Sequence, residues 1–416
     1  MLKPSFITIS ACAILVWCVI NTAAHAAETY ALGSAPVPVD GVLTGIDVLE
    51  RDGFRQLAGA NVGLITNQTG INRLAVSNIQ LLHDANAVNL RAIFSPEHGL
   101  FGKLDVDRIE DSKEPMTGIK VYSLYGTTYR PTPEMLKGID TLVFDIQDIG
   151  TRFYTYISTM GYAMQAAASN GIRFVVLDRP NPINGITISG PVLLEDKQSM
   201  VGFHRLPVRH GMTIGELAKM FKAELKLDLE LEVIPIEGWR RTDFFDATGL
   251  PWVNPSPNMR SLTEAILYPG IGLLETTNLS VGRGTDTPFE VLGAPWLAAK
   301  MLALELNRQN LPGVLFMPLQ FTPDSSKFNG ELCRGVSIQI EDRDQFESVR
   351  TGIEIALVLR RLFKLEWKTG NLGRLMGNEP VLKAIRNGRT YPEIVEIYTP
   401  ELEKFKQRRS QYLIYK

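Results

Sequence analysis

The chain has 416 residues, of which 45% are hydrophobic and 21% are charged, a composition typical of globular proteins. Its formal net charge of −2 leaves no basic excess, which argues against nucleic acid as a partner. A chain of this length is expected to fold as two domains with sizeable hydrophobic cores.

Residues 1–27 differ in composition from the rest of the chain. Lys3 is their only charged residue, an apolar run extends from Phe6 to Ile20, and small residues follow at 24–27. The run is shorter than the roughly 20 residues that a membrane-spanning helix needs, so we interpret residues 1–27 as a cleaved signal peptide, not a retained anchor. Cys12 and Cys18 lie within the run, not after it, which argues against lipidation. We therefore expect an exported protein, periplasmic or secreted, without stable membrane insertion.

Removal of residues 1–27 would leave Cys333 as the only cysteine. An intramolecular disulfide is then impossible even in an oxidising compartment, and stability must come from the core. The same removal deletes one lysine and no acidic residue, so the net charge changes from 43 − 45 = −2 to 42 − 45 = −3.

Short apolar runs alternate with helical stretches from about residue 45 onward. Five runs rich in β-branched residues predict buried strands at 62–66, 90–94, 141–144, 174–177 and 231–234. Helices are predicted around 79–88, at 155–170 and behind the capping-box pattern from Thr213 to Glu216. This alternation predicts an α/β fold, in which helices cover both faces of a mostly parallel sheet.

The pattern changes after about residue 260, where glycine-rich sequence extends from 269 to 293. Beyond it we predict a helix at 294–307, a strand at 336–340 and an amphipathic helix at about 345–363. The domain boundary is placed near 260–270. This gives a first domain over 40–265 and a smaller α/β or α+β domain over 266–416.

Polar residues follow four of the predicted strands, at the points where the strands end. In an open parallel sheet these ends share one edge and ligands bind in the crevice beside it, so the residues are candidates for a site. They are Asn67 and Gln68, Glu97 and His98, Asp145 and Asp148, and Asp178, Arg179 and Asn181. Each alone has a structural explanation as a helix cap or turn residue. Neither G-x-G-x-x-G after a strand nor G-x-x-x-x-G-K is present, so no nucleotide cofactor is expected.

Glu97 is the carboxylate of greatest interest. It follows a strand and a proline, lies beside His98, and precedes a glycine-containing loop that could approach a ligand closely. Leu100 and Phe101 suggest partly apolar surroundings, in which a carboxyl group is protonated more readily and can act as a general acid. The alternative is a surface glutamate in a turn.

Metal binding and two common nucleophile motifs find less support. His98, His210, Glu97 and Asp145 could in principle ligate a metal, but H-x-x-x-H and H-x-H spacings are absent, so no metal is expected. Asp145 and Asp148 are spaced three apart, whereas haloacid-dehalogenase phosphatases place the second aspartate two residues after the first. The G-x-S-x-G elbow of α/β-hydrolases is absent.

The second domain contains a polar, glycine-studded loop that includes Glu275, Asn278, Arg283 and Asp286. Arg283 could bind a substrate carboxylate with two hydrogen bonds. Equally, an Arg–Asp pair could simply order the loop.

Seven motifs together resemble the exo-β-N-acetylmuramidase NamZ family, formerly a domain of unknown function. They lie at 63–70 (GLITNQTG), 94–102 (FSPEHGLFG), 144–156 (FDIQDIGTRFYTY), 178–185 (DRPNPING), 209–216 (RHGMTIGE), 275–286 (ETTNLSVGRGTD) and 293–296 (GAPW). The resemblance extends from about residue 45 to the end. It implies a Rossmann-like first domain, a smaller second domain and a cleft between them. It also implies a glycoside hydrolase that removes N-acetylmuramic acid from the non-reducing ends of peptidoglycan fragments, with Glu97 as the catalytic glutamate. We count the adjacent His98 as a further catalytic candidate.

A second catalytic group is expected from this chemistry, because glycosidases usually pair two carboxylates. The candidates are Asp145, Asp148, Glu275 and Asp286, of which Asp148 ranks first because it ends a neighbouring strand. The acetamido group of the sugar could instead act as the nucleophile.

The lactyl carboxylate of muramic acid needs a cation, for which Arg283 and Arg152 are candidates. Tyr154, Tyr156 and Trp296 could stack on sugar rings, although such aromatic residues more often belong to the core. Two alternatives to a glycosidase remain open. One is an exported sugar- or muropeptide-binding protein, and the other is a metal-dependent hydrolase that uses His98, Asp145 and His210.

Overall fold

The structure is a computed structural model that describes residues 41–416. The predicted signal peptide lies outside the described residues. Residues 41–416 form one compact unit, and the predicted division into two domains stays a prediction. In this part of the chain, no helix has the length and apolar character needed to cross a membrane.

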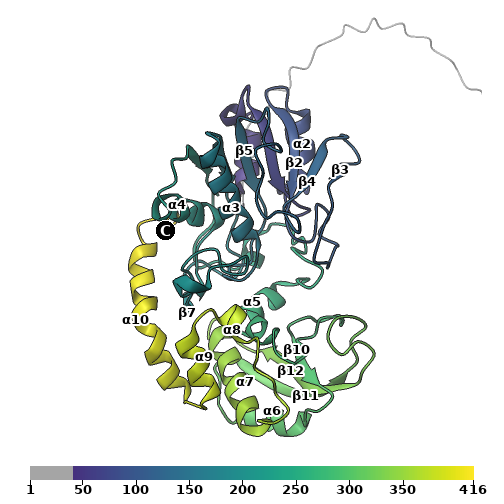
Figure 1. Cartoon of the computed structure of the whole chain (residues 1–416), viewed down its shortest axis with the longest axis vertical. Helices are drawn as coiled ribbons and strands as arrows, with labels where there is room; N and C mark the ends of the chain where they lie inside the picture. Colours follow the sequence, from purple (N-terminus) through teal and green to yellow (C-terminus); the bar gives the residue numbers. More distant parts are fainter. Residues whose placement is uncertain (1–40) are drawn as a thin grey trace, which may run out of the picture. The chain divides into compact units, whose positions relative to one another are not determined.

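A seven-stranded sheet forms the N-terminal part (Figure 1). Its strands, in spatial order, are β3 (Ser112–Lys113), β4 (Lys120–Ser123), β2 (Asn89–Ser95), β1 (Asn61–Thr66), β5 (Thr141–Asp145), β6 (Arg173–Leu177) and β9 (Leu231–Ile234). All neighbouring strands are parallel except β3, which pairs antiparallel with β4. The five predicted strands are therefore confirmed and form the centre and one edge of the sheet. The register places Thr66 beside Asp145, so the ends of β1 and β5 are level.

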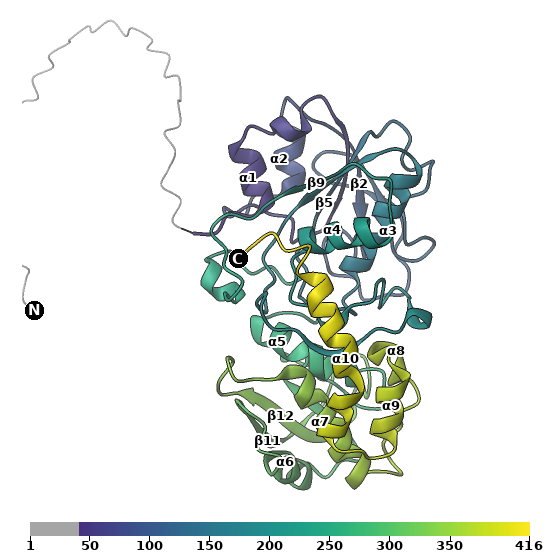
Figure 2. The same ribbon diagram turned by 90° about the vertical axis from the view of Figure 1, so that its left-hand side faces the viewer.

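Helices cover both faces of this sheet (Figure 2). α1 (Gly45–Arg51) and α2 (Asn78–Asp84) pack on one face, and α3 (Tyr156–Ser169) and α4 (Ile214–Glu224) pack on the other. Strand β5 shows why both faces are apolar. Val143 belongs to the core beneath α1 and α2, whereas Leu142 and Phe144 belong to the core beneath α3 and α4. The predicted α/β fold class is confirmed.

The C-terminal part contains a three-stranded antiparallel sheet in the order β10 (Val291–Ala294), β12 (Cys333–Ile340) and β11 (Val314–Phe321). The helix predicted at 294–307 is α6 (Ala299–Asn307), which begins later because residues 291–294 belong to β10. The predicted helix at 345–363 is α7 (Ser348–Leu362). The other elements are β7 (Ser189–Val192), β8 (Pro207–Arg209), α5 (Leu262–Ile271), α8 (Gly373–Met376), α9 (Glu379–Arg386), α10 (Tyr391–Arg409) and 3-10 turns at Arg55–Leu57, Glu195–Lys197, Phe245–Thr248 and Gly272–Leu274.

Helix α5 occupies the region where the domain boundary was predicted, and it packs closely on α7. A Cβ atom at Gly270 would lie 1.8 Å from the carbonyl oxygen of Ser348, and one at Gly352 would lie 2.3 Å from that of Gly270. Glycine is therefore required on both helices for their backbones to approach. This contact fixes the residues on either side of α5 against the C-terminal sheet and helices.

The C-terminal tail, residues 410–416, returns to the N-terminal sheet after α10 (Figure 1). The Tyr415 hydroxyl donates to Oδ2 of Asp178 over 2.6 Å, and the Ile414 amide donates to Oε1 of Glu216 over 2.9 Å. Both acceptors are buried carboxylates: Asp178 directly follows β6, and Glu216 lies in the first turn of α4. The tail thus helps to complete the core of a sheet formed some 200 residues earlier in the sequence.

Candidate active site

A pocket of about 320 Å³ lies where the turn after β2 meets segments from the C-terminal half of the chain. Its ionisable or polar lining residues are Glu97, His98, Asp105, Thr155, Ser256, Glu275, Thr276, Arg283 and Arg374. Its other lining residues are Phe153, Tyr154, Val201, Met259, Tyr268, Phe289 and Leu375. Of the residues predicted from the sequence, Glu97, His98, Tyr154, Glu275 and Arg283 meet here.

Glu97 is held in a turn directly after β2. Its neighbour His98 adopts a positive φ of 70°, and the His98 Nδ1 atom lies 2.6 Å from the carbonyl oxygen of Leu104. This contact closes the loop behind the turn and fixes the backbone beside Glu97. The strand end and the closed loop together direct a half-buried carboxyl group to the pocket.

Two hydroxyl groups contact the Glu97 carboxylate. Thr155 donates a hydrogen bond to Oε2 from the start of α3, and the Tyr125 hydroxyl forms a second hydrogen bond. Burial, together with the negative charge of Glu97, raises the pKa of Tyr125 well above its usual range, so this phenol remains a donor. Glu97 is therefore oriented by donors on two separate segments.

Aromatic side chains form the wall beside Glu97. The rings of Tyr154 and Tyr268 are 5.9 Å apart, and Tyr268 lies 4.7 Å from Phe289 and 5.2 Å from Phe153. Burial raises the pKa of both tyrosines above the usual range. The apolar surroundings predicted from Leu100 and Phe101 come instead from these rings, because Leu100 packs in another cluster and Phe101 is 55% exposed.

An ion-pair cluster forms another part of the pocket wall. Arg283 Nε lies 2.5 Å from Oε1 of Glu275, and Arg283 Nη1 lies 3.6 Å from Oδ2 of Asp105. Burial disfavours the charge of Arg283, but the two carboxylates outweigh it and hold the pKa of Arg283 above its usual range. The alternative of an Arg–Asp pair is thus met by Asp105, whereas Asp286 is exposed and lies 3.8 Å from Arg260.

Asp145 and Arg179 lie outside this pocket, in a buried ion pair. Arg179 donates from Nε to Oδ1 over 2.6 Å and from Nη2 to Oδ2 over 3.1 Å, and Asn78 donates to the same Oδ2 over 2.8 Å. Arg179 also donates to the carbonyl of Ile71. This network joins the ends of β5 and β6 to the loop before α2, so its evident function is structural.

Asp178 is buried and joins three segments. It accepts hydrogen bonds from the Gly215 amide, the Thr213 hydroxyl and the Tyr415 hydroxyl. Burial raises its pKa to about 7 despite these donors. The residue holds the start of α4 and the C-terminal tail, and it does not line the pocket.

Four predicted amide residues also have structural contacts. Asn67 accepts from the Thr69 amide and hydroxyl, and Gln68 donates to the carbonyls of residues 254 and 255. Asn181 donates to the carbonyl of residue 212, and Asn278 joins residues 366 and 368. None lines the pocket, although Gln68 holds the segment that precedes the lining residue Ser256.

Asp148 and His210 form a buried pair behind the pocket wall. His210 Nε2 lies 3.8 Å from Oδ2 of Asp148, which accepts from the Gly150 amide over 2.7 Å. Burial raises the pKa of Asp148 to about 7 and, with the charges of three nearby arginines, lowers that of His210 to about 3. Because neither residue lines the pocket, the ranking of Asp148 as the first choice for the second catalytic carboxylate finds no support in the geometry.

Arg152 is fully buried and does not line the pocket. Its Nη1 donates to the carbonyls of Pro191 and Leu206, and its Nη2 donates to those of Leu375 and Met376, over 2.6 to 3.1 Å. Burial lowers its pKa to about 9. The expectation that Arg152 binds a substrate carboxylate is therefore not supported. It fixes the backbone of α8 instead.

Of the two aromatic residues that were considered as sugar platforms, Tyr156 belongs to the core and Trp296 is partly buried against it. Tyr156 is fully buried, and Trp296 packs against Phe363 at 5.7 Å. The structure also does not bring together His98, Asp145 and His210, the residues considered for a metal-dependent hydrolase. Asp145 pairs with Arg179 and His210 lies beside Asp148, and within residues 41–416 no three His, Cys, Asp or Glu side chains gather as a metal site.

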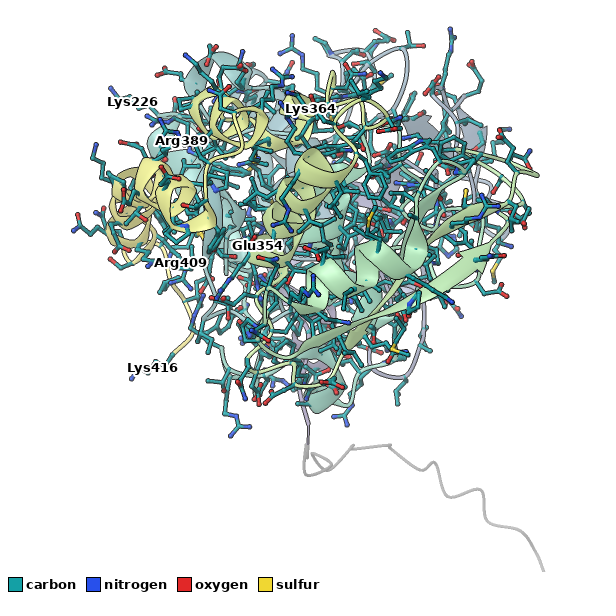
Figure 3. All side chains as sticks on the ribbon, turned by 90° about the horizontal axis from the view of Figure 1, so that it is seen from below. Lys226, Glu354, Lys364, Arg389, Arg409 and Lys416 are labelled. Carbon is teal, nitrogen blue, oxygen red and sulfur yellow. The ribbon has the colours of Figure 1, made fainter. Side chains whose placement is uncertain are left out.

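Two other pockets, of about 560 and 790 Å³, are larger but hold none of the predicted catalytic residues. One of about 560 Å³ lies between α7 and the start of α10 and includes Glu354, Lys364 and Arg389 (Figure 3). Arg389 is paired with Glu393 over 2.8 Å. The 320 Å³ pocket is the candidate active site because Glu97 and its hydroxyl donor Thr155 both line it.

Comparisons with known proteins agree with the sequence motifs. The N-terminal model of exo-β-N-acetylmuramidase NamZ matches residues 62–263, and the C-terminal model matches residues 266–415. The chain belongs to the NamZ family. It is 46% identical over 378 residues to peptidoglycan β-N-acetylmuramidase NamZ of Bacillus subtilis (strain 168), a match covering 90% of this chain and 91% of the relative.

Two crystal structures of DUF1343 family proteins from Bacteroides fragilis NCTC 9343 resemble this NamZ-family fold. The first has a TM-score of 0.85 and 38% identity, and the match covers 91% of this chain and 100% of that one. The second has a TM-score of 0.74 and 31% identity, with coverage of 90% and 99%.

Several residues that line the pocket of this NamZ-family chain were not predicted from the sequence. Thr155 lies inside a recognised motif, and its position directly before a helix could have suggested a polar role. Asp105, Tyr268 and Arg374 lie in segments with no catalytic pattern, and only the tertiary packing brings them to Glu97.

Proposed function

We propose that this protein is an exo-acting glycoside hydrolase that releases N-acetylmuramic acid from the non-reducing ends of peptidoglycan fragments, with Glu97 as general acid. The observation that carries the proposal is the setting of Glu97, a half-buried carboxyl group in a pocket with an aromatic wall and hydroxyl donors from Thr155 and Tyr125. Membership of the NamZ family supports the same reaction.

The proposed chemical step is protonation of the glycosidic oxygen. The Glu97 carboxyl group donates its proton as the bond to the anomeric carbon breaks, which allows the aglycone to leave as an alcohol. Positioned proton transfer of this kind contributes roughly 10²- to 10⁴-fold to the rate.

A second carboxylate is available in the same pocket. Glu275 lines it, whereas Asp145 and Asp148 do not, so we assign Glu275 ahead of the other candidates. Its Oε1 lies 2.5 Å from Nε of Arg283. Such a group can activate water, act as a nucleophile, or orient the acetamido group when that group attacks.

The proposed site of action is outside the cytoplasm, in the periplasm or beyond. The signal-peptide pattern of residues 1–27 supports this, as does the location of peptidoglycan itself. Cell-wall turnover is the process that such an activity would serve.

The decisive experiment compares hydrolysis of a chromogenic β-N-acetylmuramide and the matching N-acetylglucosaminide by the purified protein without residues 1–27. Glu97→Gln should reduce release from the muramide by roughly 10²- to 10⁴-fold. Glu110→Gln is the matched control, because Glu110 is an exposed glutamate of the following loop that pairs with Arg108.

Two outcomes would overturn the proposal. If the folded protein releases nothing from either substrate but binds N-acetylmuramic acid, it is a binding protein. If Glu97→Gln cleaves as fast as the native protein, another residue is the acid.

A further inference from the structure

The charged side chains that line the pocket differ in whether they have an ion-pair partner. Three carboxylates line it, from Glu97, Asp105 and Glu275, and two guanidinium groups, from Arg283 and Arg374. Arg283 contacts both Glu275 and Asp105. The side chain of Arg374 makes no hydrogen bond or ion pair with any residue in the described range 41–416, and it is exposed.

The backbone that carries Arg374 is nevertheless held firmly. The carbonyls of the next two residues, Leu375 and Met376, accept hydrogen bonds from the buried Arg152, and the Leu194 amide donates to the carbonyl of Gly377 over 2.9 Å. A fixed backbone reduces the entropy that is lost when a side chain orders on a ligand. Arg374 is thus an unpaired cation on a positioned segment, beside a pocket whose other guanidinium group is neutralised.

N-Acetylmuramic acid differs from N-acetylglucosamine by a lactyl ether that carries a carboxylate. An anion that enters a pocket with three carboxylates is repelled unless a cation is available to meet it. Arg283 already lies against two carboxylates, so its positive charge is largely neutralised. A free guanidinium can bind a carboxylate with two parallel hydrogen bonds.

We propose that Arg374 binds the lactyl carboxylate and determines the preference for muramic acid over N-acetylglucosamine. This inference rests on the proposed function, and it assigns to Arg374 the role that the sequence suggested for Arg152 or Arg283. The part played by Arg152 is to position Arg374 through the backbone of α8.

The test uses Arg374→Gln and Arg374→Lys with two substrates, the chromogenic muramide and its lactyl methyl ester, which carries no charge. A charged hydrogen bond contributes about 1.5 to 3 kcal/mol, so Arg374→Gln should lower kcat/KM for the free acid by roughly 10- to 150-fold, mainly through KM. The native protein and Arg374→Gln should cleave the uncharged ester equally well. Arg374→Lys should recover part of the loss, because lysine keeps the charge but lacks the planar fork.

Lys103→Gln is the control for long-range electrostatics. It removes one positive charge from an exposed residue of the loop that follows Glu97, without altering the pocket lining. This variant should keep the activity of the native protein on both substrates.

Equal losses on the acid and the ester, or no loss on either, would overturn the assignment of Arg374. Inactivity of the folded native protein would count against the proposed function instead. In that case calorimetric titration with free N-acetylmuramic acid and N-acetylglucosamine still tests Arg374. Weaker binding of the muramic acid alone by Arg374→Gln supports the inference, and unchanged binding refutes it.

Discussion

We expect Asp148→Asn to be more favourable for stability at pH 8 than at pH 5. The quantity compared is the free energy of unfolding of the variant minus that of the native protein, measured at each pH. Asp148 is buried, its Oδ1 has no hydrogen-bond partner within residues 41–416, and burial raises its pKa from 3.8 to about 7. His210, the ionisable group at 3.8 Å, has a pKa lowered to about 3 and therefore gives no compensating positive charge at either pH. Asparagine keeps the shape of the side chain and the acceptor for the Gly150 amide, but it cannot ionise.

The sign and size follow from the linkage between proton binding and folding. The folded-state pKa lies above the unfolded-state value, so this carboxyl group stabilises the fold fully below about pH 4 and loses that contribution as the pH rises through 7. With a shift from 3.8 to about 7, the native protein should lose roughly 2 to 3 kcal/mol from Asp148 between pH 5 and pH 8. The variant should lose none of it. Any fixed cost of the substitution cancels in the comparison.

Urea unfolding of both proteins at the two pH values measures the effect, with equal m values as the check that the unfolded states are comparable. A stability difference that does not change between pH 5 and pH 8 would refute the reasoning, since it would mean that Asp148 is already ionised in the fold at pH 5. Hydrolysis of the muramide tests the geometry at the same time. Because Asp148 lies outside the pocket, we expect the variant to keep most of its rate.

Two further predictions concern buried polar contacts outside the pocket. Tyr415→Phe removes the hydroxyl donor to Asp178 and should lower the free energy of unfolding by about 1 to 3 kcal/mol, measured by urea denaturation at pH 7, whereas Tyr129→Phe, an exposed control, should change it little. Asp145→Asn leaves the buried Arg179 guanidinium without a counter-charge and should cost about 3 to 5 kcal/mol in the same assay, so a loss below 1 kcal/mol would contradict a buried ion pair.

The central strands could be predicted because they are buried on both faces and read as continuous apolar runs. The edge strand β3 and its neighbour β4 could not, since a two-residue strand and a four-residue strand with alternating burial give no comparable run. The antiparallel sheet of the C-terminal part was recognised only through β12. Its partners contain Gly293 and Pro318, which weaken a strand pattern.

Only part of the pocket lining could be predicted from the sequence. The rule that ligands bind at the ends of parallel strands led to Glu97, which lines the pocket, but it also selected Asp145 and Asp178, whose carboxylates accept hydrogen bonds within the fold. Buried polar groups need hydrogen-bond partners, so most polar residues at such an edge serve the fold itself. The part of the pocket wall that comes from residues 256–375 depends on long-range packing. Arg374 in particular lies in no local sequence pattern that indicates a site.

The C-terminal tail has a consequence for how the chain is made. Tyr415 and Ile414 follow Asp178 and Glu216 in the sequence by 237 and 198 residues, yet they donate to these two carboxylates inside the N-terminal part. The N-terminal sheet therefore cannot reach its final stability until residues 414 and 415 have been made, because two of its buried carboxylates accept hydrogen bonds from them. A fragment cut near residue 265, where the two family models divide, would lack these donors permanently. A fusion placed directly after Lys416 would follow a segment that stabilises the core of the N-terminal part.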